Sequence, residues 1–483
     1  MKETSVELLI IGGGAAGMSA AVAATELGVK VLVAEARPAI GGNGLFPRGI
    51  FGVDSVIQRR KLTFADRDKI FKECMEYSHW KIDGRIIRTL IDRSGDTIRW
   101  LMEKGVKFTD VVHHIPNQMP EVFHITATEE NVGKTVIRCL KKYCDENGTI
   151  IVPKMRGERL LTDQNGEIKG AVCVDPEGQE VAIYAEKTIV CTGGFSGNKE
   201  MIKKYYPNFK PEEVAEGGGM RHNGDGVRMA LEAGADIEGN FAMEIAAPKI
   251  QGYGPLNLFL GKPGNIWLNR FGRRFADESI VYNFAQAANA CMRQPGGDVW
   301  VLLNEQYLTE ILQDGRDIIE EIHIPLNAEE KLSETIEKAC QDGIMCKAET
   351  IEELAEFIGC EVQILKEELD AYEQFCQTGR DAVFAKDACY LNSMAAAPYY
   401  AVKAGSDMLI THGGIRVNEK FQALNKDYKV CQNLYVAGVD FGGADADVYN
   451  VNMSGHGFGF AVNSGRIAGE TAAAEILKTN VVL

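Results

Sequence analysis

The feature that most constrains this chain is a strand–turn–helix–strand pattern in its first 35 residues. An apolar run over 6–11 is followed at once by a turn, Gly12-Gly13-Gly14-Ala15-Ala16-Gly17. Small, helix-favouring residues over 18–27 lead to a second apolar run, which ends in Glu35, 18 residues after Gly17. This order is the fingerprint of a dinucleotide-binding βαβ unit. The alternative is a glycine-rich turn in an α/β domain that binds no nucleotide.

Each position of the pattern has a physical task. Gly12 allows the tight turn, Gly14 lets a pyrophosphate approach bare backbone, and Gly17 lets the helix pack close to the strand. The first helical turn offers unpaired N–H groups and a positive dipole end to the phosphates. Glu35 can accept hydrogen bonds from a ribose diol. The pattern therefore predicts a nucleotide-containing cofactor.

Composition sets the broad class. The 483 residues are 45% hydrophobic and 25% charged, which predicts a globular protein of two or more domains. The net charge of −16 argues against nucleic acid as a partner. No apolar run reaches the roughly 18 residues of a membrane span, and the N-terminal run is no signal peptide, so we expect a cytoplasmic location. The twelve cysteines form no CxxC pair, so we expect free thiols and no metal site.

Several later motifs complete a family pattern. They are Thr192-Gly193-Gly194, Gly224-Asp225-Gly226, Tyr435-Val436-Ala437-Gly438 and Ser464-Gly465-Arg466-Ile467-Ala468-Gly469-Glu470. Together with the N-terminal fingerprint they resemble the flavoprotein subunit of the fumarate reductase and succinate dehydrogenase superfamily. That superfamily includes urocanate reductases and 3-ketosteroid dehydrogenases, and the chain resembles the ketosteroid dehydrogenase/reductase branch more than true fumarate reductases.

The resemblance implies an α/β fold, with a Rossmann-like FAD-binding domain and an inserted α+β capping domain that closes over substrate. Residues 1–241 and 396–483 would form the FAD-binding domain, and 242–395 the capping domain. The loop over 43–52 contains no histidine, so the FAD should be non-covalent. The implied FAD contacts are Gly12, Gly14, Ala15, Ala16, Gly17, Glu35, Ala36, Arg37, Gly42, Asn43, Gly44, Gly49, Ile50, Thr192, Gly193, Gly194, Asp225, Asp440, Gly455, Gly457 and Phe458.

The chain departs from the family at the substrate. Soluble fumarate reductases hold a dicarboxylate with two arginines and two histidines, and arginine suits carboxylate because its planar fork pairs bidentately. The matching positions here are Tyr282, Asn452, Ala247 and Ile410. A fumarate dianion would lose several charge-assisted bonds, each worth roughly 1.5–3 kcal/mol. We therefore expect neither fumarate nor succinate to be the substrate.

Tyr282 resembles a functional tyrosine of the ketosteroid branch, which lies seven residues after the phenylalanine of the cap motif, here Phe275. A tyrosine can donate a proton to carbon and tolerates an apolar pocket. The alternative is a tyrosine that only stacks on substrate or flavin. Tyr449 and Asn452 are weaker candidates for polarising a carbonyl. Tyr253, His412 and His456 are further candidates for lining the pocket.

These observations favour an FAD-dependent oxidoreductase acting on a C=C bond beside a carbonyl, most simply an enone reductase for a 3-oxo-steroid-like or other largely apolar substrate. One alternative is an unsaturated monocarboxylate reductase of the urocanate or cinnamate type. Another is a non-catalytic FAD-binding subunit of a larger complex. The chain has no haem motif and no second GxGxxG unit, so we expect a separate electron donor: a reductase, NAD(P)H or reduced flavin.

Overall fold

The computed structural model describes residues 2–113, 121–127, 131–207, 209, 215–216 and 220–481. The chain separates into two compact units. Unit 1 contains residues 1–209, 219–244 and 410–483, and unit 2 contains 210–218 and 245–409. The sequence predicts an FAD-binding domain over 1–241 and 396–483 and a capping domain over 242–395. These boundaries and the function assigned to each domain stay predictions.

Unit 1 is built on an eight-stranded sheet with the order β16-β17-β9-β1-β2-β6, and β8 joins β9 to β7. The five strands β17, β9, β1, β2 and β6 run parallel, with Ile10 of β1 between Val33 and Ile189. The bounds are β1 Lys2–Ile11, β2 Val31–Glu35, β6 Ile150–Pro153, β7 Arg156–Thr162, β8 Ile168–Val174, β9 Glu180–Val190, β16 Gln422–Leu424 and β17 Val430–Val436. A sequence-distant strand, β17, thus extends the sheet that the N-terminal pattern begins.

A three-stranded antiparallel sheet and helices complete this unit. The strands are β3 Ile50–Phe51, β4 Asp110–Val112 and β5 Phe123–Ile125. The α-helices are α1 Ala15–Glu26, α2 Val56–Lys61, α3 Arg67–Tyr77, α4 Gly84–Glu103, α5 Val132–Glu146, α6 Lys199–Tyr205, α7 Asp225–Glu232 and α15 His456–Val481, and short 3₁₀ turns are η1 Gly42–Leu45, η6 Gly438–Asp440 and η7 Val451–Met453.

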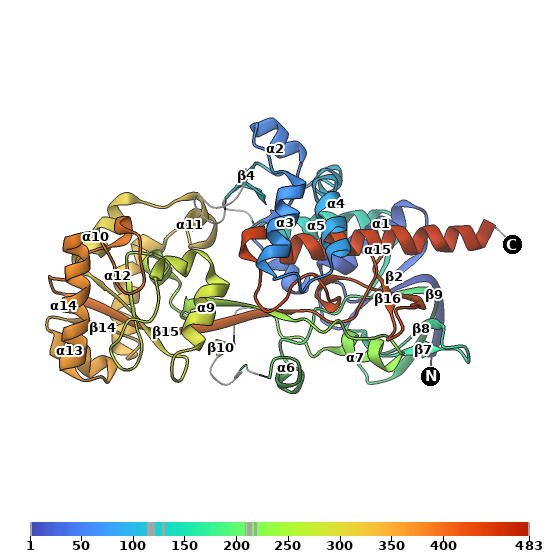
Figure 1. Ribbon diagram of the computed structural model, residues 1–483. Coiled ribbons are helices and arrows are strands. Elements are labelled where there is room, and N and C mark those ends of the chain that lie inside the picture. Colours follow the sequence, from blue (N-terminus) through green and yellow to red (C-terminus); the bar gives the residue numbers. More distant parts are fainter. Residues whose placement is uncertain are drawn as a thin grey trace. The chain divides into compact units, whose positions relative to one another are not determined.

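Helices α1 and α15 run side by side in the core of unit 1 (Figure 1). Residues 15–24 of α1 are all buried, as expected of a helix made of small side chains that is covered all round. A Cβ atom on Gly465 would lie 2.1 Å from the carbonyl oxygen of Ala16, and one on Gly469 would lie 2.4 Å from that of Ala20. The two glycines therefore permit the close approach of α15 to α1.

Unit 2 contains a six-stranded mixed sheet in which β15 is central, paired with β10, β11, β13 and β14, while β12 pairs with β13. Its strands are β10 Ala215–Glu216, β11 Ala242–Lys249, β12 Ile266–Leu268, β13 Val299–Asn304, β14 Met345–Ala348 and β15 Tyr399–His412, of which β11 begins and β15 ends in unit 1. The helices are α8 Asn257–Leu260, α9 Phe284–Met292, α10 Glu305–Asp314, α11 Ile318–His323, α12 Ala328–Gln341, α13 Ile351–Ile358 and α14 Val362–Thr378, with η3 Gly254–Leu256, η4 Glu278–Tyr282 and η5 Ala388–Tyr390.

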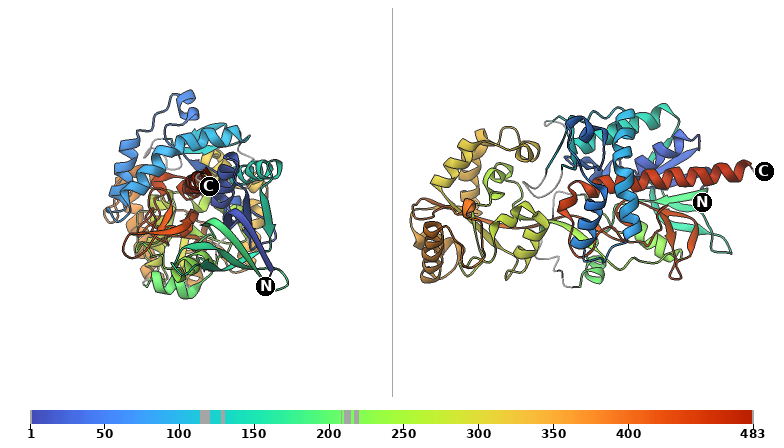
Figure 2. Two further views of the ribbon diagram at one scale, coloured as in Figure 1. Left: turned by 90° about the vertical axis from the view of Figure 1, so that its right-hand side faces the viewer. Right: turned by 45° about the horizontal axis from the view of Figure 1, so that its top comes forward.

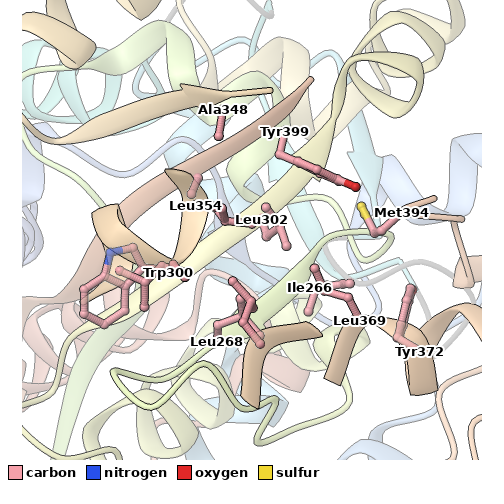
Figure 3. Packing of buried hydrophobic residues seen from close by; sticks show 14 residues of the cluster. Ile266, Leu268, Trp300, Leu302, Ala348, Leu354, Leu369, Tyr372, Met394 and Tyr399 are labelled. Atoms are coloured by element: carbon pink, nitrogen blue, oxygen red, sulfur yellow. The ribbon is translucent and has the colours of Figure 1, made fainter. Parts of the chain in front are cut away.

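The core of unit 2 forms where α13 and α14 pack on this sheet, and the close-up of Figure 3 shows the side chains of the cluster. Figure 2 shows the ribbon of the chain from two further sides. Leu302 of β13, Leu354 of α13 and Leu369 of α14 are members of one buried cluster. Beside Tyr372 the cluster borders a buried ionic group. Arg274 donates to both oxygens of Glu278 at 2.9 and 2.8 Å and to Asp381 at 3.0 Å, while Lys386 lies 3.1 Å from Glu278.

The predicted α/β fold class is confirmed. Among the helices of the described residues, none combines the length and the apolar character needed to cross a membrane. The cytoplasmic location stays a prediction.

Candidate functional site

The turn after β1 has the geometry that its glycines predict. Gly12 has a φ of +110°, and a Cβ atom there would lie 2.3 Å from the carbonyl oxygen of Cys191. A Cβ atom on Gly17 would lie 1.8 Å from the carbonyl oxygen of Gly12. At Gly14, by contrast, the nearest atom to an added Cβ is the carbonyl oxygen of Gly41, 3.9 Å away. Two of the glycines are thus required by packing, and the third leaves room beside the backbone.

The amino end of α1 is open to a ligand. Gly14 is its N-cap residue, and no side chain of the described part of the chain caps this end. The first-turn N–H groups and the positive end of the helix dipole are therefore available for phosphate oxygens. Glu35, at the end of β2, is buried, and its two carboxylate oxygens accept hydrogen bonds from the backbone N–H groups of Gly13 and Arg37, both at 2.7 Å. These bonds fix the carboxylate and leave lone pairs for a ribose diol.

Segments far apart in the sequence meet around this turn. Asn43 of η1 is hydrogen-bonded to the backbone of Met220, its Nδ2 donating to the carbonyl oxygen at 3.2 Å and its Oδ1 accepting from the N–H at 2.5 Å. Arg37 donates to the carbonyl oxygen of Arg221 at 2.6 Å. Asp225, at the start of α7, forms a bidentate pair with Arg156, with distances of 2.9 and 2.7 Å. The predicted contacts at 37, 43 and 225 are thus brought to one side of unit 1.

Asp440 holds the turn over 192–194. Its carboxylate accepts hydrogen bonds from the N–H of Thr192, from the Thr192 hydroxyl at 2.9 Å and from the N–H of Gly194 at 2.7 Å. The side chain is fully buried, and burial raises the pKa of Asp440 against the opposing effect of these N–H donors. The sequence predicts Asp440 as a direct FAD contact, and this stays a prediction; its carboxylate also holds Thr192 and Gly194, two further predicted contacts.

The start of α15 meets the small sheet at β3. The N–H of Phe51 donates to the carbonyl oxygen of Gly455 at 3.2 Å. A Cβ atom on Gly455 would lie 2.9 Å from the Phe123 ring, and one on Gly49 would lie 2.4 Å from the same ring. The predicted contacts Gly49, Ile50, Gly455, Gly457 and Phe458 therefore come from two chain segments that lie against each other.

A buried polar cluster, which we call the His412 cluster, lies beside this point and consists of Glu244, His412, Asp445, Tyr449 and His456. His412 Nδ1 lies 3.2 Å from Asp445, and His412 Nε2 lies 3.7 Å from Glu244. His456 Nε2 lies 3.0 Å from Asp445. The Tyr449 ring stacks on the His456 ring with centroids 4.3 Å apart, and its hydroxyl oxygen accepts from the Gly457 N–H at 3.4 Å. All five residues belong to unit 1.

The cluster is strongly polarised. Burial alone would lower the pKa of His412, but the carboxylates of Asp445 and Glu244 raise it to about 9. Burial would raise the pKa of Asp445, yet the two imidazoles hold it well below its usual range. Burial raises the pKa of Tyr449 well above its usual value. At neutral pH the cluster therefore contains an imidazolium at His412, a carboxylate at Asp445 and a neutral phenol.

Sequence reasoning identified only part of this cluster. It named Tyr449 as a candidate and His412 and His456 as further pocket candidates. It missed Asp445 and Glu244, because no spacing links residues that lie on β11, on β15 and before α15. Asn452 lies in η7, close in sequence to Tyr449, and its N–H donates to Asn450 at 3.1 Å.

Tyr282 belongs to unit 2, at the end of η4. It is half-buried, and its ring centroid lies 6.3 Å from that of Tyr390. Burial and a hydrogen bond with Tyr390 raise the pKa of Tyr282 above its ordinary value. Tyr282 is therefore a protonated phenol across the neutral range.

Comparison with known proteins identifies the family. A model of the FAD binding domain matches residues 7–450. The chain belongs to this family. It is also 29% identical to the vinyl phenol reductase of Lactiplantibacillus plantarum over 98% of this chain and 97% of that protein.

Two solved structures share the fold. An open flavocytochrome c3 fumarate reductase has a TM-score of 0.77 at 24% identity, covering 98% of this chain and 79% of that one. The 3-ketosteroid Δ4-(5α)-dehydrogenase of Rhodococcus jostii has a TM-score of 0.76 at 20% identity, covering 98% of both chains.

These comparisons confirm the resemblance to the fumarate reductase and succinate dehydrogenase superfamily, and they confirm FAD as the cofactor. The chain is an FAD-dependent oxidoreductase that acts on CH–CH bonds. The open space at Gly14 and the uncapped amino end of α1 fit the pyrophosphate of FAD. The individual FAD contacts predicted from the sequence stay predictions.

Proposed function

We propose that this enzyme reduces a C=C bond conjugated to a carbonyl group in an uncharged, largely apolar substrate. When bound and reduced by the electron donor, FAD would supply a hydride for the β-carbon. The protein's own residues bind the substrate, hold its carbonyl oxygen and provide the proton for the α-carbon. The observation that carries this proposal is the charge of the His412 cluster.

The His412 cluster contains two carboxylates, Glu244 and Asp445, and two imidazoles, His412 and His456. Even with both imidazoles protonated it has no net positive charge. Two positions that the family resemblance assigns to substrate are close to it in the sequence, since Ile410 is two residues before His412 and Asn452 lies between Tyr449 and His456. A carboxylate substrate would meet no excess of positive charge there to balance its own negative charge. A neutral carbonyl needs no balancing charge.

The replaced family residues support the same conclusion. Tyr282, Asn452, Ala247 and Ile410 stand where fumarate reductases have four cationic or basic side chains, and Ala247 is buried. The similarity to a vinyl phenol reductase also favours an uncharged substrate, since vinyl phenol carries no carboxylate.

In the proposed mechanism Tyr282 donates the proton to the α-carbon. Its raised pKa keeps it protonated, which a general acid requires. Tyr449 and Asn452 are assigned to the carbonyl oxygen, where hydrogen-bond donors stabilise the negative charge that develops during reduction. Run in reverse, the same groups would support a dehydrogenase. Electrons come from a separate donor: a reductase, NAD(P)H or reduced flavin.

The test is an anaerobic single turnover. The FAD-loaded protein is reduced with dithionite, and the flavin absorbance is followed after addition of a 3-oxo-4-ene steroid, a simpler cyclic enone, cinnamate or fumarate. We expect the enones to reoxidise the flavin, and Tyr282→Phe to slow this step by about 100-fold or more, the usual contribution of a general acid. Tyr390→Phe is the matched control, because it removes the hydroxyl next to Tyr282 and keeps Tyr282 as the proton donor.

Reoxidation by fumarate would refute the argument from the replaced residues. Reoxidation by cinnamate alone would favour the monocarboxylate alternative. An enone reaction that Tyr282→Phe leaves unchanged would retain the substrate class and remove Tyr282 as the donor.

A further inference from the structure

Residues 220–224 of unit 1, which we call the strap, are fastened on one side to the segment after β2. Asn43 forms two hydrogen bonds with the backbone of Met220, its Nδ2 donating at 3.2 Å and its Oδ1 accepting at 2.5 Å. Arg37 donates to the carbonyl oxygen of Arg221 at 2.6 Å. Arg37 and Asn43 are both residues that the family resemblance assigns to FAD. The strap is therefore attached to the predicted FAD site by residues of that site.

The strap is fastened on its other side to the turn after β9. The N–H of Gly197 donates to the carbonyl oxygen of His222 at 2.7 Å, and the N–H of Gly224 donates to that of Gly194 at 3.0 Å. All of these residues belong to unit 1. Hydrogen bonds before, at and after His222 thus fix the backbone from which its side chain projects.

The His222 ring lies against two glycines. A Cβ atom on Gly193 would lie 3.0 Å from Cε1 and from Nε2 of the ring and 3.1 Å from its Cδ2. A Cβ atom on Gly42 would lie 4.0 Å from Cε1. A side chain at position 193 would therefore displace the ring, and glycine permits it to lie there. Gly42 and Gly193 are also implied FAD contacts, so the ring is close to two predicted contact points.

The turn at Gly42 also connects His222 to the open space at Gly14. Gly41 pairs with Gly14 in a parallel β-bridge, and its N–H donates to the carbonyl oxygen of Gly13 at 2.8 Å. Gly42, the next residue, faces the His222 ring. The ring is therefore one residue along this turn from the backbone that borders the space where the pyrophosphate of FAD fits.

The ring has hydrogen-bonding capacity that the described residues leave unused, since it forms no hydrogen bond with any of them. Burial and the nearby Arg37 guanidinium lower the pKa of His222 to about 4, against the opposing effect of Asp225. The other charged groups near it are Arg221, in the strap, and Asp440, which holds the turn over 192–194. At neutral pH the ring is an uncharged imidazole with one N–H donor and one acceptor nitrogen.

We infer that His222 binds the diphosphate of FAD, donating its ring N–H to a phosphate oxygen, and that the strap holds the ring in this position. A diphosphate is an acceptor for the unused N–H, and its negative charge suits a site beside the Arg37 guanidinium. The inference concerns the cofactor and goes beyond the proposed function, because it does not depend on which substrate the enzyme reduces.

The experiment measures FAD binding to the FAD-free protein by quenching of the flavin fluorescence. His222→Leu removes both ring nitrogens, and His222→Gln keeps an N–H donor. His323→Leu is the matched control, because it replaces an exposed histidine of unit 2. We expect His222→Leu to raise the Kd of FAD about 10-fold or more, the effect of losing a hydrogen bond to a charged group. His222→Gln should retain most of the affinity, and the control should match wild type.

A competitor identifies the part of FAD that His222 contacts. ADP-ribose contains the adenosine diphosphate of FAD and lacks the flavin ring. Its displacement of FAD gives its own Kd for each variant. We expect His222→Leu to weaken ADP-ribose by the same factor as FAD.

The charge of the diphosphate gives a second readout. The His222 ring is titrated by NMR, and its signal is assigned by its loss in His222→Leu. Without FAD the ring should stay largely uncharged from pH 8 to pH 5. Bound FAD should raise the His222 pKa by about 1–3 units, the effect of a nearby opposite charge. Because the protonated ring binds the anion more tightly, the ratio of the His222→Leu Kd to the wild-type Kd should then grow as the pH falls, about 10-fold between pH 8 and pH 5 for a rise of about 2 units.

An unchanged FAD Kd in His222→Leu would overturn the inference. A loss of affinity for FAD that spares ADP-ribose would place His222 at the flavin half of the cofactor, and a His222 pKa that FAD does not raise would place the ring away from the diphosphate; either result also overturns it. A purely structural role would lower the urea midpoint of the FAD-free His222→Leu protein, which we expect to match wild type. None of these measurements uses a substrate, so their failure and the failure of the proposed function are distinguishable.

Discussion

The substitution Asp440→Asn tests how the turn over 192–194 is held. The carboxylate of Asp440 accepts three hydrogen bonds, one oxygen serving the N–H and the hydroxyl of Thr192 and the other serving the N–H of Gly194. Asparagine has the same shape and only one accepting oxygen. In its better orientation the amide oxygen serves Thr192, and the NH₂ group faces the N–H of Gly194.

The expected cost follows from this geometry. One buried N–H loses its acceptor, which costs about 1–3 kcal/mol, and the two remaining bonds lose their charge assistance. We therefore expect Asp440→Asn to lower the free energy of unfolding by about 2–4 kcal/mol. Urea unfolding followed by circular dichroism would measure it, on the FAD-loaded protein and after removal of FAD.

Asp68→Asn is the control, since Asp68 pairs with the half-exposed Arg88 and an exposed pair contributes little to stability. A loss below about 1 kcal/mol for Asp440→Asn would refute the reasoning. An equal loss with and without FAD would mean that Asp440 acts through the turn, and a loss confined to the FAD-loaded protein would mean that it contacts the cofactor directly.

Three further predictions follow from the packing and the charges. Gly17→Ala should abolish stable FAD retention, measured by gel filtration and absorbance, because its Cβ atom would lie 1.8 Å from the Gly12 carbonyl oxygen; retained FAD would contradict this. Arg274→Met should cost about 3–5 kcal/mol in urea unfolding, because Glu278 would keep a buried and under-compensated charge. The raised pKa of His412 means that its stabilisation is fully present below about pH 6.5 and is lost as the pH rises through about 9. Wild type should therefore lose about 2–4 kcal/mol over this range and His412→Gln should not, as urea midpoints measured against pH would show.

The cofactor side of the enzyme could be predicted from the sequence to a large extent. The glycine turn, Glu35 and the α/β class depend largely on local rules, since a Cβ atom on Gly17 would meet the nearby carbonyl oxygen of Gly12. The clash at Gly12 is with Cys191 and required the tertiary structure. The family motifs extended this prediction to FAD. The hydrogen bonds of Asp440 could not be predicted in this way, because its partners Thr192 and Gly194 lie about 250 residues away in the sequence.

The first 35 residues and the later family motifs suffice to predict the βαβ unit and FAD, because both depend on short patterns, and FAD is confirmed. The replacement of the dicarboxylate-binding residues stays a prediction. The ionic character of the interior arises only on folding. Glu244, His412, Asp445 and His456 have no common spacing, and each alone is an ordinary polar residue. Their charge states arise because folding removes them from water together, and in a buried environment the nearest opposite charge determines whether a group keeps its proton.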